Sequence, residues 1–162
     1  MATNKFEGVQ QLEPVKVGVL GLGTVGGGTV NLLERNRDEI TRRAGRPIDI
    51  VHAAARHPER PRTCSTDGIR LTFDAFEVVD DPNIEIVVEL IGGDKLAREL
   101  TLRAIDNGKH VVTANKAMIA LHGNEIFARA REKGVSVGFE AAVAGGIPII
   151  KAVREGLVGN RI

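Results

Sequence analysis

Short apolar runs alternate with amphipathic segments along most of the chain. Apolar runs bounded by turn residues predict buried strands, and apolar positions that recur every three or four residues predict helices. The predicted strands are Val15–Leu20, Ile48–Ala55, Ile69–Phe73, Ile84–Ile91, His110–Thr113 and Val135–Glu140. The predicted helices are Thr24–Ala44, Ala75–Val79, Asp94–Asn107, His122–Lys133 and Ile147–Glu155. Strands that alternate with helices of about 10–15 residues imply a parallel sheet with helices on both faces.

Charge and aromatic content exclude several classes of protein. The 162 residues include 22 basic and 21 acidic side chains, and the formal net charge of +1 does not favour attraction to nucleic acid. With five Phe and neither Tyr nor Trp, the chain lacks platforms for stacking bases. No apolar stretch reaches the roughly 18 residues of a membrane span, and the polar residues 1–14 predict a flexible leader. We therefore expect a cytoplasmic protein with neither a nucleic-acid nor a membrane partner.

Glycine is in excess, with 19 residues, and its first cluster forms a recognisable motif. Gly21-Leu22-Gly23-Thr24-Val25-Gly26 is a G-x-G-x-x-G sequence that directly follows a predicted strand and opens a predicted helix. In this context Gly21 permits a tight turn, Gly23 lets the backbone approach a pyrophosphate, and Gly26 allows close packing of helix and strand. The helix N-terminus then offers free N–H groups to the phosphates. The motif predicts a Rossmann-type, doubly wound fold that binds a dinucleotide.

The end of the second predicted strand bears on the choice of cofactor. A site that prefers NAD usually places an acidic residue there, to accept a hydrogen bond from the ribose 2′-hydroxyl. Here the strand ends in alanines followed by Arg56, and Asp49 lies at the opposite end. The guanidinium of Arg56 suits a 2′-phosphate, which favours NADP over NAD, unless Arg56 is simply a solvated loop residue.

Two further loops follow predicted strands at the same edge of the sheet. Gly92 and Gly93 come after one strand, and Lys116 comes after the next. Lys116 is placed to contact a cofactor ribose, a substrate carboxylate or a developing oxyanion, or else is a solvated lysine. Glu140 ends a predicted apolar strand, and because a buried carboxylate needs a partner, it is either an anchor for a helix N-terminus or a cation ligand.

Three segments together resemble the homoserine dehydrogenase family. They are GLGTVGGGTV at 21–30, GKHVVTANK at 108–116 and FEAAVAGGIPIIK at 139–151, and the resemblance extends from about Val15 to the end of the chain. It implies reversible, NAD(P)-dependent interconversion of aspartate 4-semialdehyde and homoserine, in the pathway to threonine, methionine and isoleucine. It also implies cofactor contacts from the glycine motif, from Gly92 and Gly93 and from Lys116.

The resemblance also implies a monovalent cation, typically sodium. The matching ligands are the carboxylate of Glu140 and the backbone carbonyls of Val143, Gly145 and Ile147. Ligation by oxygen atoms alone suits a hard cation.

Members of this family continue well beyond the matched region, into a substrate-binding and dimerising domain. We therefore expect a flexible leader at 1–14, a dinucleotide-binding domain at 15–140 and the start of a truncated second domain at 141–162. The resemblance implies that the proton-transfer lysine lies beyond Ile162, and the family's substrate residues have no match here. We thus expect no catalytic residue in this fragment, which should bind cofactor without appreciable catalysis, and we expect the full-length enzyme to be a homo-oligomer.

Two alternatives remain open. One is a non-catalytic dinucleotide-sensing module, which would not need Lys116 or Glu140. The other is a related reductase such as dihydrodipicolinate reductase, a family that lacks the EAAVAGGIP stretch.

Overall fold

The computed structural model describes residues 12–145 and 147–156 and contains a six-stranded sheet with the order β3-β2-β1-β4-β5-β6. Every strand pair is parallel. The strands are β1 (Val15–Leu20), β2 (Ile48–Ala54), β3 (Arg70–Thr72), β4 (Ile86–Glu89), β5 (His110–Thr113) and β6 (Val137–Gly138). This order, in which the chain moves outward from β1 to one edge and then from β4 to the other, confirms the doubly wound, Rossmann-type prediction.

Three expectations from the sequence fall wholly or partly outside the described residues. The leader predicted at 1–14 is described only from residue 12 onward. The segment predicted at 141–162 is described only as far as residue 156, with a gap at 146, so Ile162 and the five residues before it lie outside the description. The proton-transfer lysine expected beyond Ile162 has no counterpart in this sequence, and its position stays a prediction.

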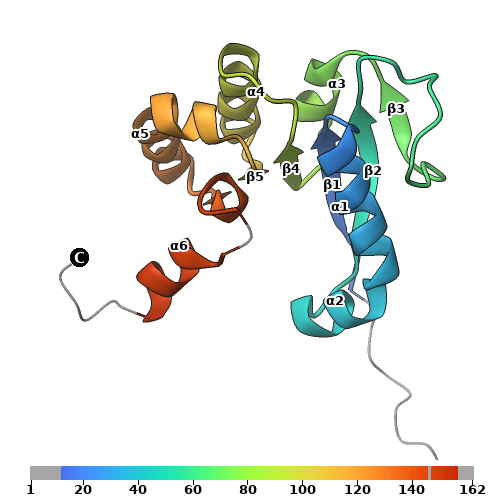
Figure 1. Ribbon diagram of the computed structural model, residues 1–162, viewed down its shortest axis with the longest axis horizontal. Helices are drawn as coiled ribbons and strands as arrows, with labels where there is room; N and C mark the ends of the chain where they lie inside the picture. The colour runs from blue at the N-terminus through green and yellow to red at the C-terminus, as the bar shows by residue number, and fades with distance from the viewer. Residues whose placement is uncertain (1–11, 146, 157–162) are drawn as a thin grey trace, which may run out of the picture.

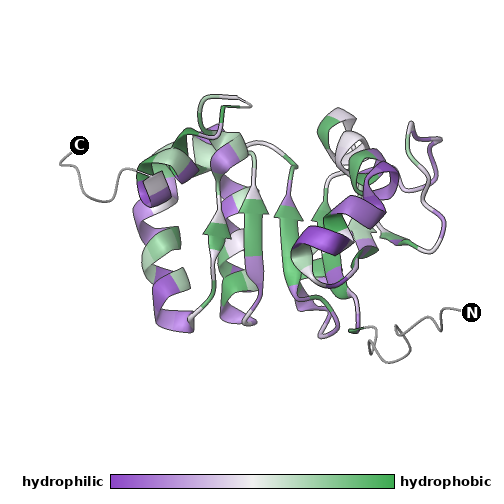
Figure 2. Ribbon diagram, turned by 90° about the horizontal axis from the view of Figure 1, so that it is seen from below, coloured by the Kyte–Doolittle hydropathy of each residue, from purple (hydrophilic) through white to green (hydrophobic). Residues whose placement is uncertain are grey.

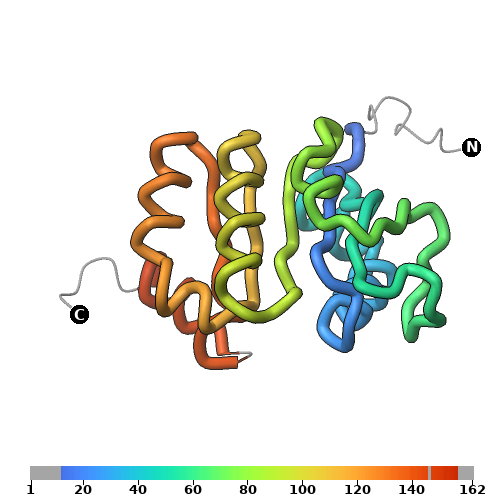
Figure 3. Tube along the Cα trace, turned by 90° about the horizontal axis from the view of Figure 1, so that it is seen from above, coloured from blue at the N-terminus to red at the C-terminus, as the bar shows by residue number. Residues whose placement is uncertain are grey.

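The helices cover both faces of the sheet. They are α1 (Thr24–Arg35), α2 (Arg37–Ala44), α3 (Ala75–Asp80), α4 (Lys95–Asp106), α5 (Lys116–Lys133) and α6 (Ile149–Lys151), with short helical segments η1 (Glu140–Ala142) and η2 (Ala152–Gly156). The helices α1 and α2 lie on one face, and α3, α4 and α5 lie on the other (Figure 1). Seen from above, α4 and α5 run side by side over the sheet (Figure 3).

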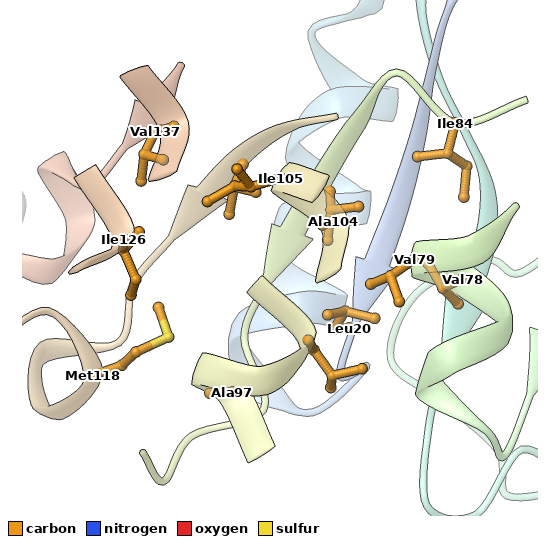
Figure 4. Packing of buried hydrophobic residues seen from close by; sticks show 14 of the residues in the cluster. Leu20, Val78, Val79, Ile84, Ala97, Ala104, Ile105, Met118, Ile126 and Val137 are labelled. Atoms are coloured by element: carbon orange, nitrogen blue, oxygen red, sulfur yellow. The ribbon is translucent and has the colours of Figure 1, made fainter. Parts of the chain in front are cut away.

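The larger part of the core lies between the sheet and α3, α4 and α5. Leu20 of β1, Val87 of β4 and Val111 of β5 are buried there against Leu100 and Ile105 of α4. Figure 4 shows this packing, which continues to Met118 and Ile126 on α5. Aliphatic side chains therefore form a continuous layer on this face of the sheet.

The opposite face carries a smaller cluster, centred on β1 and β2. Val17 and Val19 pack there against Leu22 and Val30, while Val112 of β5 is 42% exposed. Figure 2, in which apolar residues are green, shows α1 and α2 in front of only one part of the sheet. Within the described residues, the α1 side of β4 and β5 is therefore incompletely covered.

Several predicted boundaries were wrong, each for a local reason. The helix expected over 24–44 breaks at Asn36, whose φ of −107° and ψ of 20° are not helical and whose side-chain Nδ2 donates to the carbonyl of Leu32. The helix expected from His122 begins six residues earlier, at Lys116, because Asn115 caps it by accepting a hydrogen bond from the N–H of Met118. The strand expected to end at Glu140 is only two residues long, and Glu140 instead opens a helical turn. No helix of the described residues is long and apolar enough to cross a membrane.

Candidate functional site

The glycine motif forms the turn between β1 and α1. Gly21 has a φ of +98°, and a Cβ atom there would lie 2.9 Å from the carbonyl oxygen of Leu90. At Gly26, a Cβ atom would lie only 2.0 Å from the carbonyl oxygen of Gly21. Both positions therefore require glycine, as predicted from the motif.

The start of α1 has the features of an anion site. Gly23 is the N-cap, no side chain caps the helix, and its first turn has no acidic residue. Gly23, Thr24 and Val25 are exposed, and apart from the chain neighbours no atom lies within 4 Å of where a Cβ of Gly23 would be. The backbone at this end of α1 is therefore open to a ligand. A helix N-terminus with uncapped N–H groups stabilises negative charge. The motif thus fits the pyrophosphate of a dinucleotide.

The loop after β2 brings basic side chains to this edge. Arg56 is exposed, and its guanidinium donates no hydrogen bond to any of the described residues. Arg62, which we did not single out from the sequence, donates from Nη1 to the carbonyl of Leu22 at 2.9 Å and from Nη2 to that of His57 at 2.6 Å. Arg62 therefore ties the loop to the glycine motif.

The loops after β4 and β5 meet at the same edge. Gly92 and Gly93 both have a φ of +72°, a conformation that side chains rarely adopt. Asn115 donates from Nδ2 to the carbonyl of Gly93 at 2.5 Å. Lys116 follows directly as the first residue of α5 and is exposed, rather than lying in a loop as expected.

Glu140 serves as an anchor for a helix N-terminus. Its Oε1 accepts from the N–H of Ile150 at 3.0 Å, and its Oε2 accepts from the N–H of Lys151 at 3.1 Å. The turn between Glu140 and α6 includes Ala144 and Gly145, with φ angles of 53° and 38°. Within the described residues, no group of three or more His, Cys, Asp or Glu side chains is arranged to hold a metal ion. A cation here would therefore depend on backbone carbonyls together with Glu140.

A hollow of about 640 Å³ lies at the opposite edge of the sheet, near the amino ends of β4 and β5. Its lining includes Asp80, Lys109 and His110. Lys109 donates to the carbonyls of Asp81 and Ile84, and burial lowers the pKa of its ammonium group against the opposing effect of Asp81 and Asp80. Asp80 in turn is paired with Arg103. Lys109 and Asp80 thus already have partners, and the ligands of open parallel sheets bind at the carboxyl ends of the strands. The glycine edge is therefore the candidate site.

Comparison with known proteins indicates a dinucleotide-binding family. The model of the homoserine dehydrogenase NAD-binding domain matches residues 21–140. A homoserine dehydrogenase from Pseudomonas aeruginosa is 67% identical over 151 residues, which are 93% of this chain and 34% of that protein. A homoserine dehydrogenase from Bacillus subtilis is 39% identical over 93% of this chain and 35% of its own length. The chain thus spans about a third of the length of these relatives.

Solved structures give the same result. The crystal structure of a homoserine dehydrogenase from Thiobacillus denitrificans has a TM-score of 0.87 and 61% identity, over 95% of this chain and 36% of that one. A hyperthermophilic archaeal homoserine dehydrogenase in complex with NADPH has a TM-score of 0.75 and 25% identity, over 91% of this chain and 50% of that one. The fold, the glycine motif and these matches show that the chain belongs to the homoserine dehydrogenase family and corresponds to its NAD-binding domain.

Proposed function

We propose that this domain binds NADP(H) along the carboxyl edge of its sheet. The pyrophosphate lies at the N-terminus of α1, on Gly21–Gly26, and the 2′-phosphate lies beside Arg56. The observation that carries the proposal is the uncapped start of α1 with open space at Gly23. The nicotinamide half extends towards Gly92, Gly93 and Lys116.

We further propose that the domain serves the interconversion of aspartate 4-semialdehyde and homoserine in a homo-oligomeric, cytoplasmic enzyme. When bound, the nicotinamide accepts a hydride from the alcohol carbon or returns it to the aldehyde. The residues of this chain hold and orient that ring, and residues 141–162 begin the substrate domain. Catalysis also needs groups that hold the substrate in line with the cofactor, and residues 15–140 are not expected to supply them.

Titration of the chain with NADPH tests the cofactor proposal. We expect Arg56→Asp to weaken the binding of NADPH about tenfold or more relative to the binding of NADH. The reason is that a charge-assisted hydrogen bond to the 2′-phosphate is lost. Arg60→Asp is a matched control, since it makes the same charge change in the same exposed loop. An equal loss in both variants, or an unchanged ratio of the two cofactors in Arg56→Asp, would overturn the role of Arg56.

We also propose a site for a monovalent cation. Its ligands are the carboxylate of Glu140 and the backbone carbonyls of Val143, Gly145 and Ile147. It is supported by the all-oxygen donor set and by the left-handed turn at Ala144 and Gly145. Sodium at ten times its Kd is then expected to stabilise the chain by about 1.4 kcal/mol relative to a bulky organic cation.

The measurement is thermal unfolding in sodium and in choline chloride at equal ionic strength. The sodium effect is expected to disappear in Glu140→Gln and to persist in Glu155→Gln, a control in the helical segment that follows α6. Identical melting temperatures of the unaltered chain in the two salts would contradict the cation site.

A further inference from the structure

A buried carboxylate lies beneath the loops assigned to the nicotinamide half of the cofactor. Glu89, the last residue of β4, is completely buried and pairs in register with Thr113 of β5. Its Oε2 accepts from the hydroxyl of Thr113 at 2.6 Å, and its Oε1 accepts from the N–H of Ile91 at 3.0 Å. Burying a carboxylate is costly without such partners, and an apolar pair would join two strands without this cost.

The hydrogen bonds at Thr113 have a defined direction. The backbone N–H of Asn115 donates to the Thr113 hydroxyl oxygen at 3.0 Å. The single hydroxyl hydrogen of Thr113 is therefore available to Glu89, and both oxygens of that carboxylate act as acceptors. An amide at position 89 would have to present its NH₂ group to one of two donors.

Asn115 extends the network to the Gly92–Gly93 loop and to the start of α5. Its Oδ1 accepts from the N–H of Met118, which caps α5, and its Nδ2 donates to the carbonyl of Gly93. Asn115 is itself buried. Among the described residues, Asn115 alone forms a hydrogen bond with the Gly92–Gly93 pair. Apart from chain neighbours, no atom lies within 4 Å of the Cβ position of either glycine. The two glycines therefore have no side-chain packing of their own to hold them in place.

From this geometry we propose that Glu89, Thr113 and Asn115 are positioning residues. Their chain of hydrogen bonds holds the Gly92–Gly93 loop against the start of α5, and so sets the relative positions of that loop and Lys116 for the nicotinamide half of the cofactor. The inference rests on the proposed binding of NADP(H). It adds that the two halves of the cofactor depend on different hydrogen bonds, because within the described residues no hydrogen bond of the Glu89, Thr113 or Asn115 side chains reaches residues 21–26.

Asn115→Asp is the sharpest test. Aspartate retains the acceptor that caps α5, but it replaces the donor to Gly93 with a second acceptor. We expect its Kd for NADPH to rise about tenfold, or about 1.4 kcal/mol. Its Kd for adenosine 2′,5′-bisphosphate, which represents only the adenosine half, is expected to remain that of the unaltered chain. The readouts are quenching of NADPH fluorescence and calorimetry, with the melting temperature measured on every variant.

A matched pair at Thr113 separates positioning from folding. Thr113→Val keeps the branched shape and removes the hydroxyl, so it should show the same selective loss as Asn115→Asp. Thr113→Ser keeps the hydroxyl and should bind both ligands normally. Glu89→Gln should also weaken the binding of NADPH without weakening the binding of adenosine 2′,5′-bisphosphate.

The outcomes distinguish this inference from the proposed function. If the unaltered chain fails to bind NADPH, the proposed function falls and this inference falls with it. If the unaltered chain binds NADPH but the Asn115 and Thr113 variants bind both ligands normally, only the positioning role is wrong. A parallel loss of both ligands, or a failure of Thr113→Ser to restore binding, would reduce the network to a general structural role.

Discussion

At the scale of single residues, the glycines of the first helix differ in what surrounds them. Gly26 faces the backbone of Gly21 so closely that a Cβ atom would overlap its carbonyl oxygen, whereas Gly28, two residues later, is exposed with no atom within 4 Å of its Cβ position. The two residues lie in one helix and look alike in the sequence. Their substitution by alanine should therefore have opposite effects.

We expect Gly26→Ala to destabilise the domain by about 3 kcal/mol, at the upper end of the cost of overpacking, and to abolish NADPH binding. Gly28→Ala should stabilise it by about 0.5–1 kcal/mol, because alanine loses less conformational entropy than glycine in a helix. Urea unfolding of both variants measures the difference. A Gly26→Ala protein as stable as the unaltered chain would show that the strand and helix are not in close contact.

Residue roles were predictable where a local motif carries them. Gly21 and Gly26 belong to one short motif, so the sequence alone predicts that both must be glycine, and the structure confirms this. The approach of Gly23 to a pyrophosphate stays a prediction. Arg62 and Glu89 were not predictable in this way, because each has a partner far away in the chain. Leu22 lies 40 residues from Arg62, and Thr113 lies 24 residues from Glu89. For Glu89 the one available signal was an acidic residue in an apolar strand, and Glu85 shared that signal.

At the scale of elements, α3 and α4 are joined by an ion pair at the surface. Arg103 of α4 donates to both carboxylate oxygens of Asp80, at 2.6 and 2.7 Å. This hydrogen bonding lowers the pKa of Asp80 below its ordinary value, against a smaller opposing effect of burial. Asp80 therefore binds a proton less readily in the folded state than in the unfolded state.

The sign of the pH dependence follows from this difference. The contribution of Asp80 is fully present above its unfolded pKa of about 3.9, and it is lost as the pH falls through the lower folded value. We expect Asp80→Asn to lower stability at neutral pH and to make the loss of stability below about pH 4 shallower. Urea unfolding between neutral and acidic pH measures both effects, with Asp38→Asn as a control for net charge. A variant whose stability falls as steeply with acid as that of the unaltered chain would contradict this account.

Element types were predicted well, and element ends were predicted poorly. The alternation of strands and helices identified all six strands, because an apolar run can be recognised even when its first and last residues are misjudged. The break at Asn36 and the early start of α5 depend on hydrogen bonds of single asparagine side chains. Hydrophobic periodicity contains no information about such bonds.

At the scale of the whole molecule, the candidate binding loops and the hydrophobic core lie in different parts of the sheet. All strands are parallel, so the glycine motif, the Gly92–Gly93 loop and the start of α5 gather at the carboxyl edge. The large core lies on the side of α3, α4 and α5, while Val112 remains partly exposed on the other side. The fold class followed from the sequence because alternating strands and helices permit few topologies. The incomplete cover over β4 and β5 did not follow, since a continuous apolar run predicts a buried strand without showing how completely each of its faces is covered.

The most direct test of the central claim, that the dinucleotide binds at the carboxyl edge, is NMR of the ¹⁵N-labelled chain titrated with NADPH. The account predicts that amide signals of residues 21–26, 92–93 and 115–116 shift together and saturate with one Kd. Signals of Glu85, Gly108 and Lys109, which line the hollow at the amino edge, should remain in place. Saturable shifts confined to the amino edge, or no shifts at millimolar NADPH, would contradict the claim.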